Sequence, residues 1–125
     1  MAEETRRSTT TNVISMGRTC IANLKDVEKC DMTLEDIDKI KEIITDEGAH
    51  IISTNYHFFT PYGLSVTYIL SESHLAIHTW PEHKCLAIDA FTCGDVVDPH
   101  TLVEKISKYL NATIEKIFDF ERGIS

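Results

Sequence analysis

Residues 68–82, YILSESHLAIHTWPE, hold a hydroxyl, a carboxylate, a second hydroxyl and an imidazole between two apolar runs. The four polar residues from Ser71 to His74 include no Gly, Pro or Asn-Gly pair of the kind that favours a tight turn. The segment is therefore either a loop between two strands or a place where the chain is built to react.

A serine hydrolase and a metal site are two ways to use these residue types. Ser73, His78 and Asp89 could form a hydrolytic triad, but the sequence has no G-x-S-x-G elbow and no Gly-rich oxyanion loop. The potential metal ligands are His74, His78, His83 and Cys85. Their spacing matches no structural zinc pattern, and two histidines four positions apart do not converge on a strand as they do on a helix. Both signals are nonspecific.

A third chemistry uses the peptide bond that precedes a serine. The serine hydroxyl can attack the preceding carbonyl carbon and convert the amide into an ester. A base that then removes the serine α-hydrogen splits the chain by elimination, and the new N-terminus hydrolyses to a pyruvoyl group. That carbonyl can form a Schiff base with an amine and act as an electron sink, as pyridoxal phosphate does.

The elements that must position these groups follow from periodicity and turn residues. Thr33 and Asp36 fit a capping box that opens a first helix, and Gly48 is suited to end it. Asp98 and Pro99 open a second helix as N-cap and first helical residue. Apolar stripes predict the buried helix faces, formed by Leu34, Ile37, Ile40, Ile43 and Ile44 in the first and by Leu102, Val103, Ile106, Tyr109 and Leu110 in the second.

Alternating and β-branched segments predict the strands, which span residues 12–25, 50–59, 64–70, 75–80, 85–93 and 112–121. The order β-α-β-β-β-β-α-β predicts an α/β protein of the α+β type, a two-layer sandwich with a largely antiparallel sheet and both helices on one face. The uncovered sheet face then calls for a partner, which makes a dimer plausible. Period-two counting places Ser65 and Ser73 on one face if the strand stays regular, and places His74 and His78 together.

Composition limits the function classes. The 125 residues, 42% hydrophobic and 26% charged, predict one globular domain over residues 13–125 after a disordered tail over residues 1–12. A net charge of -8 with scattered basic residues argues against binding to nucleic acid or an anionic membrane. Without an apolar run of membrane-spanning length or a signal segment, we expect a cytoplasmic protein whose four cysteines are thiols.

The blocks SESHLAIHTWPE and DAFTCGD closely resemble the prokaryotic S-adenosylmethionine decarboxylase proenzymes, the small class of that family. HFFTPYGLS, DPHTLVEKI and MGR match further parts of the family pattern, and the resemblance extends over residues 13–123. It implies a fold like the one predicted above. It also implies that the chain cleaves itself between Glu72 and Ser73 into fragments 1–72 and 73–125, with Ser73 becoming the pyruvoyl group.

The resemblance assigns further roles residue by residue. His78 matches the base that removes the α-hydrogen during processing, and Ser65 matches a serine associated with processing. Cys93 matches the proton donor that acts after carbon dioxide leaves. Glu82 matches a carboxylate that binds the ribose hydroxyls, and Phe59 an aromatic that stacks on adenine.

The implied activity is decarboxylation of S-adenosylmethionine, whose amine forms a Schiff base with the carbonyl of modified Ser73, to supply aminopropyl groups for spermidine synthesis. The implied assembly is a homodimer of processed protomers with active sites near the interface, and neither a metal nor a diffusible cofactor is expected. We interpret Tyr62 and Trp80 as packing residues.

Several positions depart from the family pattern, among them residues 63–66, which read GLSV where relatives have G-V-S-G. Relatives commonly carry His where this chain has Thr19, an acidic residue where it has Asn23, and a basic residue where it has Phe58. Because some members of the superfamily decarboxylate arginine or ornithine, those substrates are the alternative. The alternative from another class is a non-processing α/β domain that binds a small molecule.

Overall fold

The computed structural model describes residues 14–71, 73–93 and 95–125. The predicted tail over residues 1–12 and Glu72 lie outside the described residues. The predicted element order is confirmed, with one added 3-10 helix, η1. The elements are β1 Ile14–Lys25, α1 Leu34–Asp46, β2 Ile51–Phe58, β3 Leu64–Leu70, β4 Ser73–Trp80, η1 Pro81–His83, β5 Cys85–Thr92, α2 Pro99–Tyr109 and β6 Thr113–Ile124.

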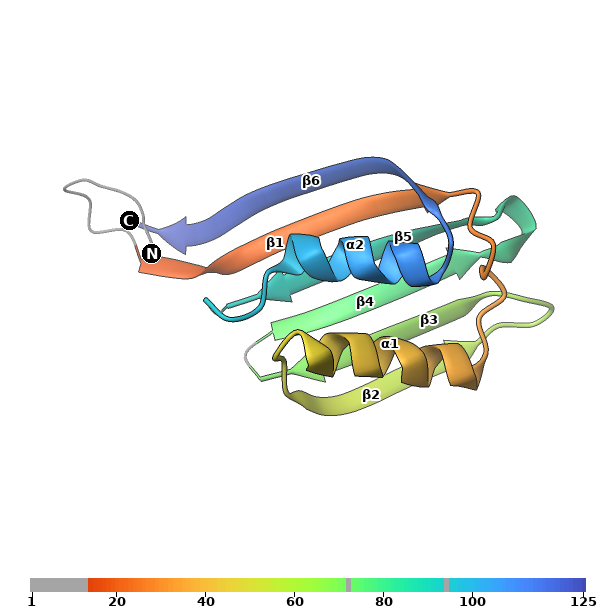
Figure 1. The fold of residues 1–125 in the computed structure, drawn as a ribbon, viewed down its shortest axis with the longest axis horizontal. Coiled ribbons are helices and arrows are strands. Elements are labelled where there is room, and N and C mark those ends of the chain that lie inside the picture. Colours follow the sequence, from red (N-terminus) through yellow and green to blue (C-terminus); the bar gives the residue numbers. More distant parts are fainter. Residues whose placement is uncertain (1–13, 72, 94) are drawn as a thin grey trace.

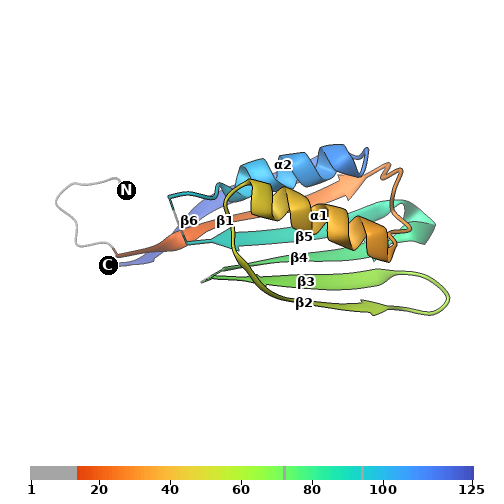
Figure 2. The same ribbon diagram turned by 60° about the horizontal axis from the view of Figure 1, so that its bottom comes forward.

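The six strands form a single sheet in the order β2-β3-β4-β5-β1-β6. Every neighbouring pair is antiparallel. Both helices cover the same face, α1 beside β2 and β3 and α2 beside β5 and β1 (Figures 1 and 2). The predicted two-layer α+β sandwich is therefore confirmed. No helix in the described part of the chain is long and apolar enough to cross a membrane.

Helix α1 begins as predicted at a capping box. The Thr33 hydroxyl accepts from the Asp36 backbone N–H, and the Asp36 carboxylate accepts from the Thr33 N–H at 2.9 Å. Ile37, Ile40 and Ile44 are buried, whereas Leu34 is 53% exposed. The prediction that Leu34 belongs to the buried face was wrong, because this first helical residue lies beyond the edge of the core.

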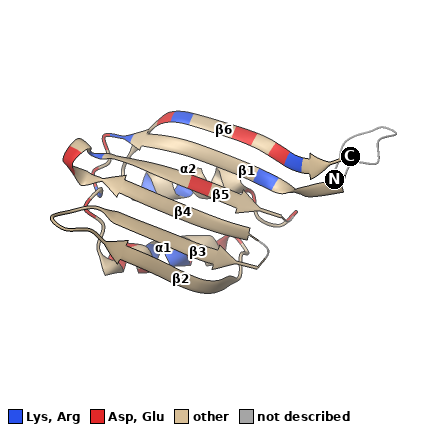
Figure 3. Cartoon of the chain, turned by 180° about the vertical axis from the view of Figure 1, so that it is seen from behind, with Lys and Arg blue, Asp and Glu red and all other residues tan. Residues whose placement is uncertain are grey.

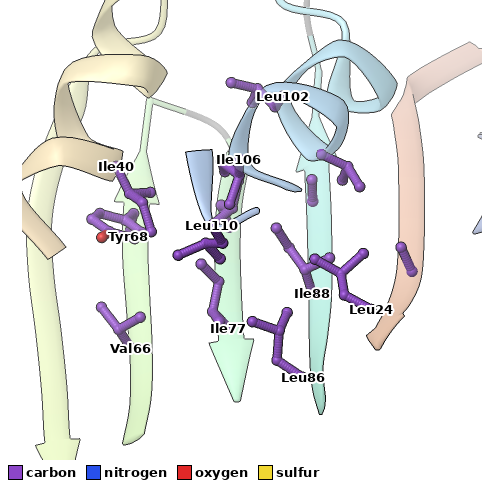
Figure 4. Packing of buried hydrophobic residues seen from close by; sticks show 14 of the residues in the cluster. Leu24, Ile40, Val66, Tyr68, Ile77, Leu86, Ile88, Leu102, Ile106 and Leu110 are labelled. Carbon is purple, nitrogen blue, oxygen red and sulfur yellow. The ribbon is translucent and has the colours of Figure 1, made fainter. Parts of the chain in front are cut away.

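Helix α2 also begins as predicted, with the Asp98 carboxylate accepting from the His100 N–H at 3.1 Å. The apolar core lies between the helices and the sheet, where Ile106 of α2 and its C-cap residue Leu110 pack over Ile77 of β4 (Figure 4). The ring of Tyr68 reaches up toward α1, and its hydroxyl donates to the Ile37 carbonyl at 2.8 Å. Such packing fixes both helices relative to the central strands.

Strand β4 begins at Ser73, two residues before the predicted start. Ser73 pairs with Leu70 across the β3–β4 ladder, so both lie on the helix-covered face, whereas Ser65 pairs with His78 on the open face. The prediction that Ser65 and Ser73 share a face was wrong. Period-two counting failed because it carried the β3 alternation through Ser71 and Glu72, which connect the two strands.

The open face of the sheet is mixed in character. Charged residues gather along β6, although Asp119 lies on the helix-covered face with His100, and β2, β3 and β4 carry none (Figure 3). Large apolar side chains on this face are exposed to solvent, namely Ile69 at 39%, Phe118 at 57% and Phe120 at 49%. Across neighbouring strands, Ile69 pairs with His74, which pairs with Phe91. Phe91 in turn pairs with Thr19, and Thr19 pairs with Phe120, so these residues form one continuous row on the open face.

Candidate functional site

Ser65 and His78 form a hydrogen-bonded pair on the open face of the sheet. They are directly opposite in the β3–β4 register, and Ser65 Oγ lies 2.7 Å from His78 Nδ1. The sheet therefore fixes both backbones, and the short contact fixes the imidazole. For Nε2 to accept a proton, the neutral ring must carry its hydrogen on Nδ1 and donate it to the Ser65 oxygen.

A pocket of about 340 Å³ opens beside this pair. Its walls include Phe59, Tyr62, Trp80 and Glu82. The loop between β2 and β3 supplies the first two aromatic rings, and a hydrogen bond of 2.8 Å from the Phe59 N–H to the Gly63 carbonyl closes it. Gly63 has φ +112, a left-handed conformation that favours glycine.

The end of β4 supplies the other wall of the pocket. Trp80 is the last residue of the strand, and η1 follows at once and carries Glu82. Tyr62 and Trp80 are 49% and 45% exposed, so the interpretation of these residues as packing was wrong. A signal for Trp80 was present in the sequence, because Trp80 shares the strand parity of His78 and so must lie on the same face.

His57 is a further residue that sequence reasoning missed. It pairs with Ser65 across the β2–β3 ladder, so His57, Ser65 and His78 form one row on the open face. Its ring centroid lies 4.5 Å from that of Phe59 in an edge-to-face arrangement. The signal for His57 was its place in the HFFTPYGLS block, two positions before Phe59.

Ser73 and Cys93 meet at the other end of β4. Both line a pocket of about 190 Å³, together with His50, Val96 and Val97 among others. Ser73 is half-buried, and its hydroxyl donates to the Ser71 carbonyl at 3.3 Å. Cys93 is exposed and follows the last residue of β5. The structure therefore brings together the predicted cleavage residue and the predicted proton donor.

The two groups of residues do not meet within one chain. His78 lies five positions after Ser73 on the same strand, which corresponds to a distance of about 17 Å along β4. Their side chains also lie on opposite faces of the sheet. Ser65, His78, Glu82 and Phe59 share one pocket, while Ser73 and Cys93 share another.

The described residues do not form the hydrolytic triad or the metal site that were considered as alternatives. Asp89 pairs with Ala76 rather than with His78. Among the described residues, the one group with the spacing of metal ligands is Cys20, His100 and Asp119, none of which the sequence suggested.

Burial, reinforced by the hydrogen bond and negative charge of Asp119, raises the pKa of the Cys20 thiol to about 12. Cys20 is therefore protonated at neutral pH, and all four cysteines are thiols as predicted.

Comparisons with known proteins agree with the fold and with the motif blocks. A family model described as S-adenosylmethionine decarboxylase matches residues 18–123. The chain belongs to the S-adenosylmethionine decarboxylase family. The resemblance inferred from the motifs is thereby confirmed, and membership makes this chain a decarboxylase.

Curated relatives of this family match over most of the chain. The S-adenosylmethionine decarboxylase proenzyme of Thermotoga petrophila is 40% identical over 113 residues, which cover 87% of this chain and 85% of the relative. Proenzyme 1 of Bacillus cereus is 40% identical over 114 residues, with the same two shares covered. The proenzyme of Thermodesulfovibrio yellowstonii is 39% identical over 95 residues, covering 73% of this chain and 70% of the relative.

A solved structure agrees with the fold. The adenosylmethionine decarboxylase from Aquifex aeolicus superposes with a TM-score of 0.72 at 28% identity, covering 86% of this chain and 89% of that chain. The α+β sandwich predicted from the order of elements is therefore also the fold of a known family member.

Proposed function

We propose that this chain cleaves itself between Glu72 and Ser73 and then decarboxylates S-adenosylmethionine, which supplies aminopropyl groups for spermidine synthesis. The observation that carries the proposal is that Ser73 and Cys93 line one pocket in a member of the S-adenosylmethionine decarboxylase family. Four cysteine thiols suit a cytoplasmic enzyme.

The residues around Ser73 fit a pyruvoyl group formed in place. Ser73 is the first residue of β4, so the sheet would anchor the new N-terminus of fragment 73–125 from its second residue onward. The group would supply a carbonyl that withdraws the electrons left by the departing carboxylate. Cys93 in the same pocket would hold the proton that the product carbon needs.

His78 and Ser65 would act from a second copy of the chain. One strand separates His78 from Ser73 by about 17 Å, which no side-chain rotation can close. For His78 to act as the base, it would have to come from another protomer. It would act on the α-hydrogen of Ser73, which is attached to the backbone carbon rather than to the side chain on the helix-covered face.

The open face of the sheet supports this assembly. Ile69, Phe118 and Phe120 are exposed there, and burying such apolar side chains between two sheets would stabilise a dimer. A two-fold axis that lies between the sheets and runs across the strands reverses the strand direction of the second copy. It sets the Ser73 end of one copy against the His78 end of the other and so forms two equivalent sites.

The pocket beside His78 suits a cationic nucleoside. The Glu82 carboxylate can accept hydrogen bonds from the two hydroxyls of a ribose. The rings of Phe59, Tyr62 and Trp80 offer apolar faces to adenine and negative faces to a sulfonium. With Ser73 contributed by the facing copy, the amino-acid end of S-adenosylmethionine would reach the reactive carbonyl while its nucleoside remains in this pocket.

Two measurements on the purified chain test the proposal. Mass spectrometry should find fragments 1–72 and 73–125, while Ser73→Ala should remain one polypeptide. Wild-type protein that stays intact after long incubation would instead indicate a non-processing binding domain. Carbon dioxide release from S-adenosylmethionine, arginine and ornithine in parallel should occur with the first substrate, and release from arginine or ornithine alone would reject the proposed substrate.

A further inference from the structure

Gly17 of β1 lies against the backbone that carries Cys93. It has φ +142 and sits at a shift in the β1–β6 register between Ser15 and Gly17. A Cβ atom at this position would lie 2.4 Å from the Thr92 carbonyl oxygen and 2.8 Å from the Cys93 Cα. Both are backbone atoms, so no side-chain movement can relieve the overlap.

Thr92 holds the same segment from inside. It is 2% exposed, and its hydroxyl donates to the Val97 carbonyl at 2.8 Å. This hydrogen bond joins the two ends of the connection that carries Cys93 from β5 toward α2. The Cys93 backbone is thus bounded by β1 on one side and tied to the start of the α2 segment on the other.

We propose that Gly17 and Thr92 are positioning residues that set where the Cys93 thiol meets the reacting carbon. The inference rests on the proposed function, in which Cys93 returns a proton after carbon dioxide leaves. Ser73 and Cys93 share a pocket of only about 190 Å³, so a backbone displaced to accommodate a methyl group carries the thiol away from the substrate.

The place where the proton is added decides the products. The electron pair left by carbon dioxide is shared between the substrate carbon and the carbon derived from Ser73. A proton on the substrate carbon, followed by water, releases the amine and restores the pyruvoyl carbonyl. A proton on the other carbon, followed by water, releases an aldehyde and leaves the nitrogen on residue 73 as alanine, which ends turnover. A misplaced Cys93 thiol therefore leads to alanine at residue 73, which can be detected on the enzyme after turnover.

The test compares Gly17→Ala and Thr92→Val with a matched control, Gly123→Ala. Gly123 lies in β6 opposite Ser15, is exposed, and has no positive φ. Both test variants should still cleave at Ser73, because Cys93 takes no part in that step. They should lose at least 10-fold in kcat, and N-terminal sequencing after turnover should find alanine at residue 73 of the C-terminal fragment. The control should behave as wild type.

A second readout does not use the active enzyme. In a Ser73→Ala background, the rate at which iodoacetamide alkylates Cys93 should change at least 3-fold in either test variant. The control should leave this rate unchanged. If Gly17→Ala fails to fold, the result for Thr92→Val decides the matter, because the valine side chain has nearly the same volume as that of threonine. Normal kcat and an unchanged alkylation rate in Thr92→Val would overturn the inference. A wild-type chain that neither cleaves nor turns over would contradict the proposed function instead.

Discussion

At the Trp80 end of β4 the two candidate side chains both lie within paired strands, whereas at the Ser73 end the candidate residues lie at the ends of strands. Ser65 and His78 are directly opposite on paired strands and lie 2.7 Å apart. Ser73 instead adjoins the β3–β4 connection, and Cys93 follows the last residue of β5. We call these the base end and the cleavage end after their proposed roles: the ladder fixes the Ser65–His78 pair at the base end, while Ser73 begins its strand at the cleavage end.

This difference has a consequence for assembly. A bond that breaks must lie where its two new ends can move apart, and a strand interior with hydrogen bonds on both sides does not allow that. A base that must be oriented is better placed within the ladder. One strand can meet both requirements only at its opposite ends, which is why the proposed function takes the base from a second copy of the chain.

The largest effect is expected at the cleavage end. Ser73→Ala removes the hydroxyl that attacks the preceding carbonyl, so cleavage and decarboxylation should both be abolished. Denaturing electrophoresis and carbon dioxide release measure the two losses. Because the remaining contacts of β4 are unchanged, the melting temperature should stay within a few degrees of the unprocessed wild type. Residual cleavage at the same bond would contradict the role of this hydroxyl.

Cys93→Ala should separate the two reactions at the same end. Cleavage should proceed nearly as in wild type, while kcat falls by about 10²-fold, a typical loss when a positioned proton donor is removed. Time courses of fragment formation and of product formation measure the two effects. Equal slowing of both steps would show that Cys93 supports processing and has no separate part in turnover.

Ser65→Ala should weaken the base end without removing the base. The His78 ring loses the acceptor that holds its Nδ1 hydrogen, so cleavage should slow by about 10-fold, equivalent to about 1.4 kcal/mol of activation free energy. Ser65→Thr keeps the hydroxyl and should recover most of the rate. Cleavage by Ser65→Ala at the wild-type rate would mean that the short contact to His78 does not orient the ring.

The smallest effect is expected outside both ends, at His100. Its hydrogen bond to Asp119 raises the pKa of the imidazole from 6.5. The pair therefore contributes fully below pH 6.5, and its contribution is lost as the pH rises through the higher folded-state value. Because the two side chains are 34% and 36% exposed, His100→Gln should cost only about 0.5 kcal/mol at pH 5.5.

Urea unfolding of the Ser73→Ala background at pH 5.5 and pH 9 measures this difference. The loss should disappear at the higher pH, and cleavage rates in the Ser73-containing chain should be unaffected by His100→Gln. A loss that grows with pH would reverse the sign expected from the raised pKa and would contradict the ion pair.

Most of the fold could be predicted from the sequence because local signals agreed with one another. The capping box at Thr33, the Asp98-Pro99 start and the alternation of LSVTYIL each specify an element, and all three are present. Antiparallel pairing followed from strands that adjoin in sequence, whereas the place of β1 between β5 and β6 was not predicted. These signals depend only on residues close in the chain.

The arrangement of the site could not be predicted in the same way. Whether Ser73 continues the alternation of β3 depends on how Ser71 and Glu72 connect the strands, and that geometry has no signature in residue type. The closeness of Gly17 to Cys93 joins residues far apart in the chain. The motif supplied the candidate residues, whose roles stay predictions, and their division between two pockets is a property of the folded sheet.

Complementation between two inactive variants tests the shared site most directly. Ser73→Ala and His78→Ala should each fail to cleave when folded alone. When they are co-expressed, one site in each mixed dimer combines Ser73 of the second chain with His78 of the first. Only the His78→Ala chain should then become cleaved, and decarboxylation should return to at most half the wild-type level per mixed dimer. If the His78→Ala chain cleaves on its own, or if the mixture stays intact although mixed dimers form, the site does not require the second copy.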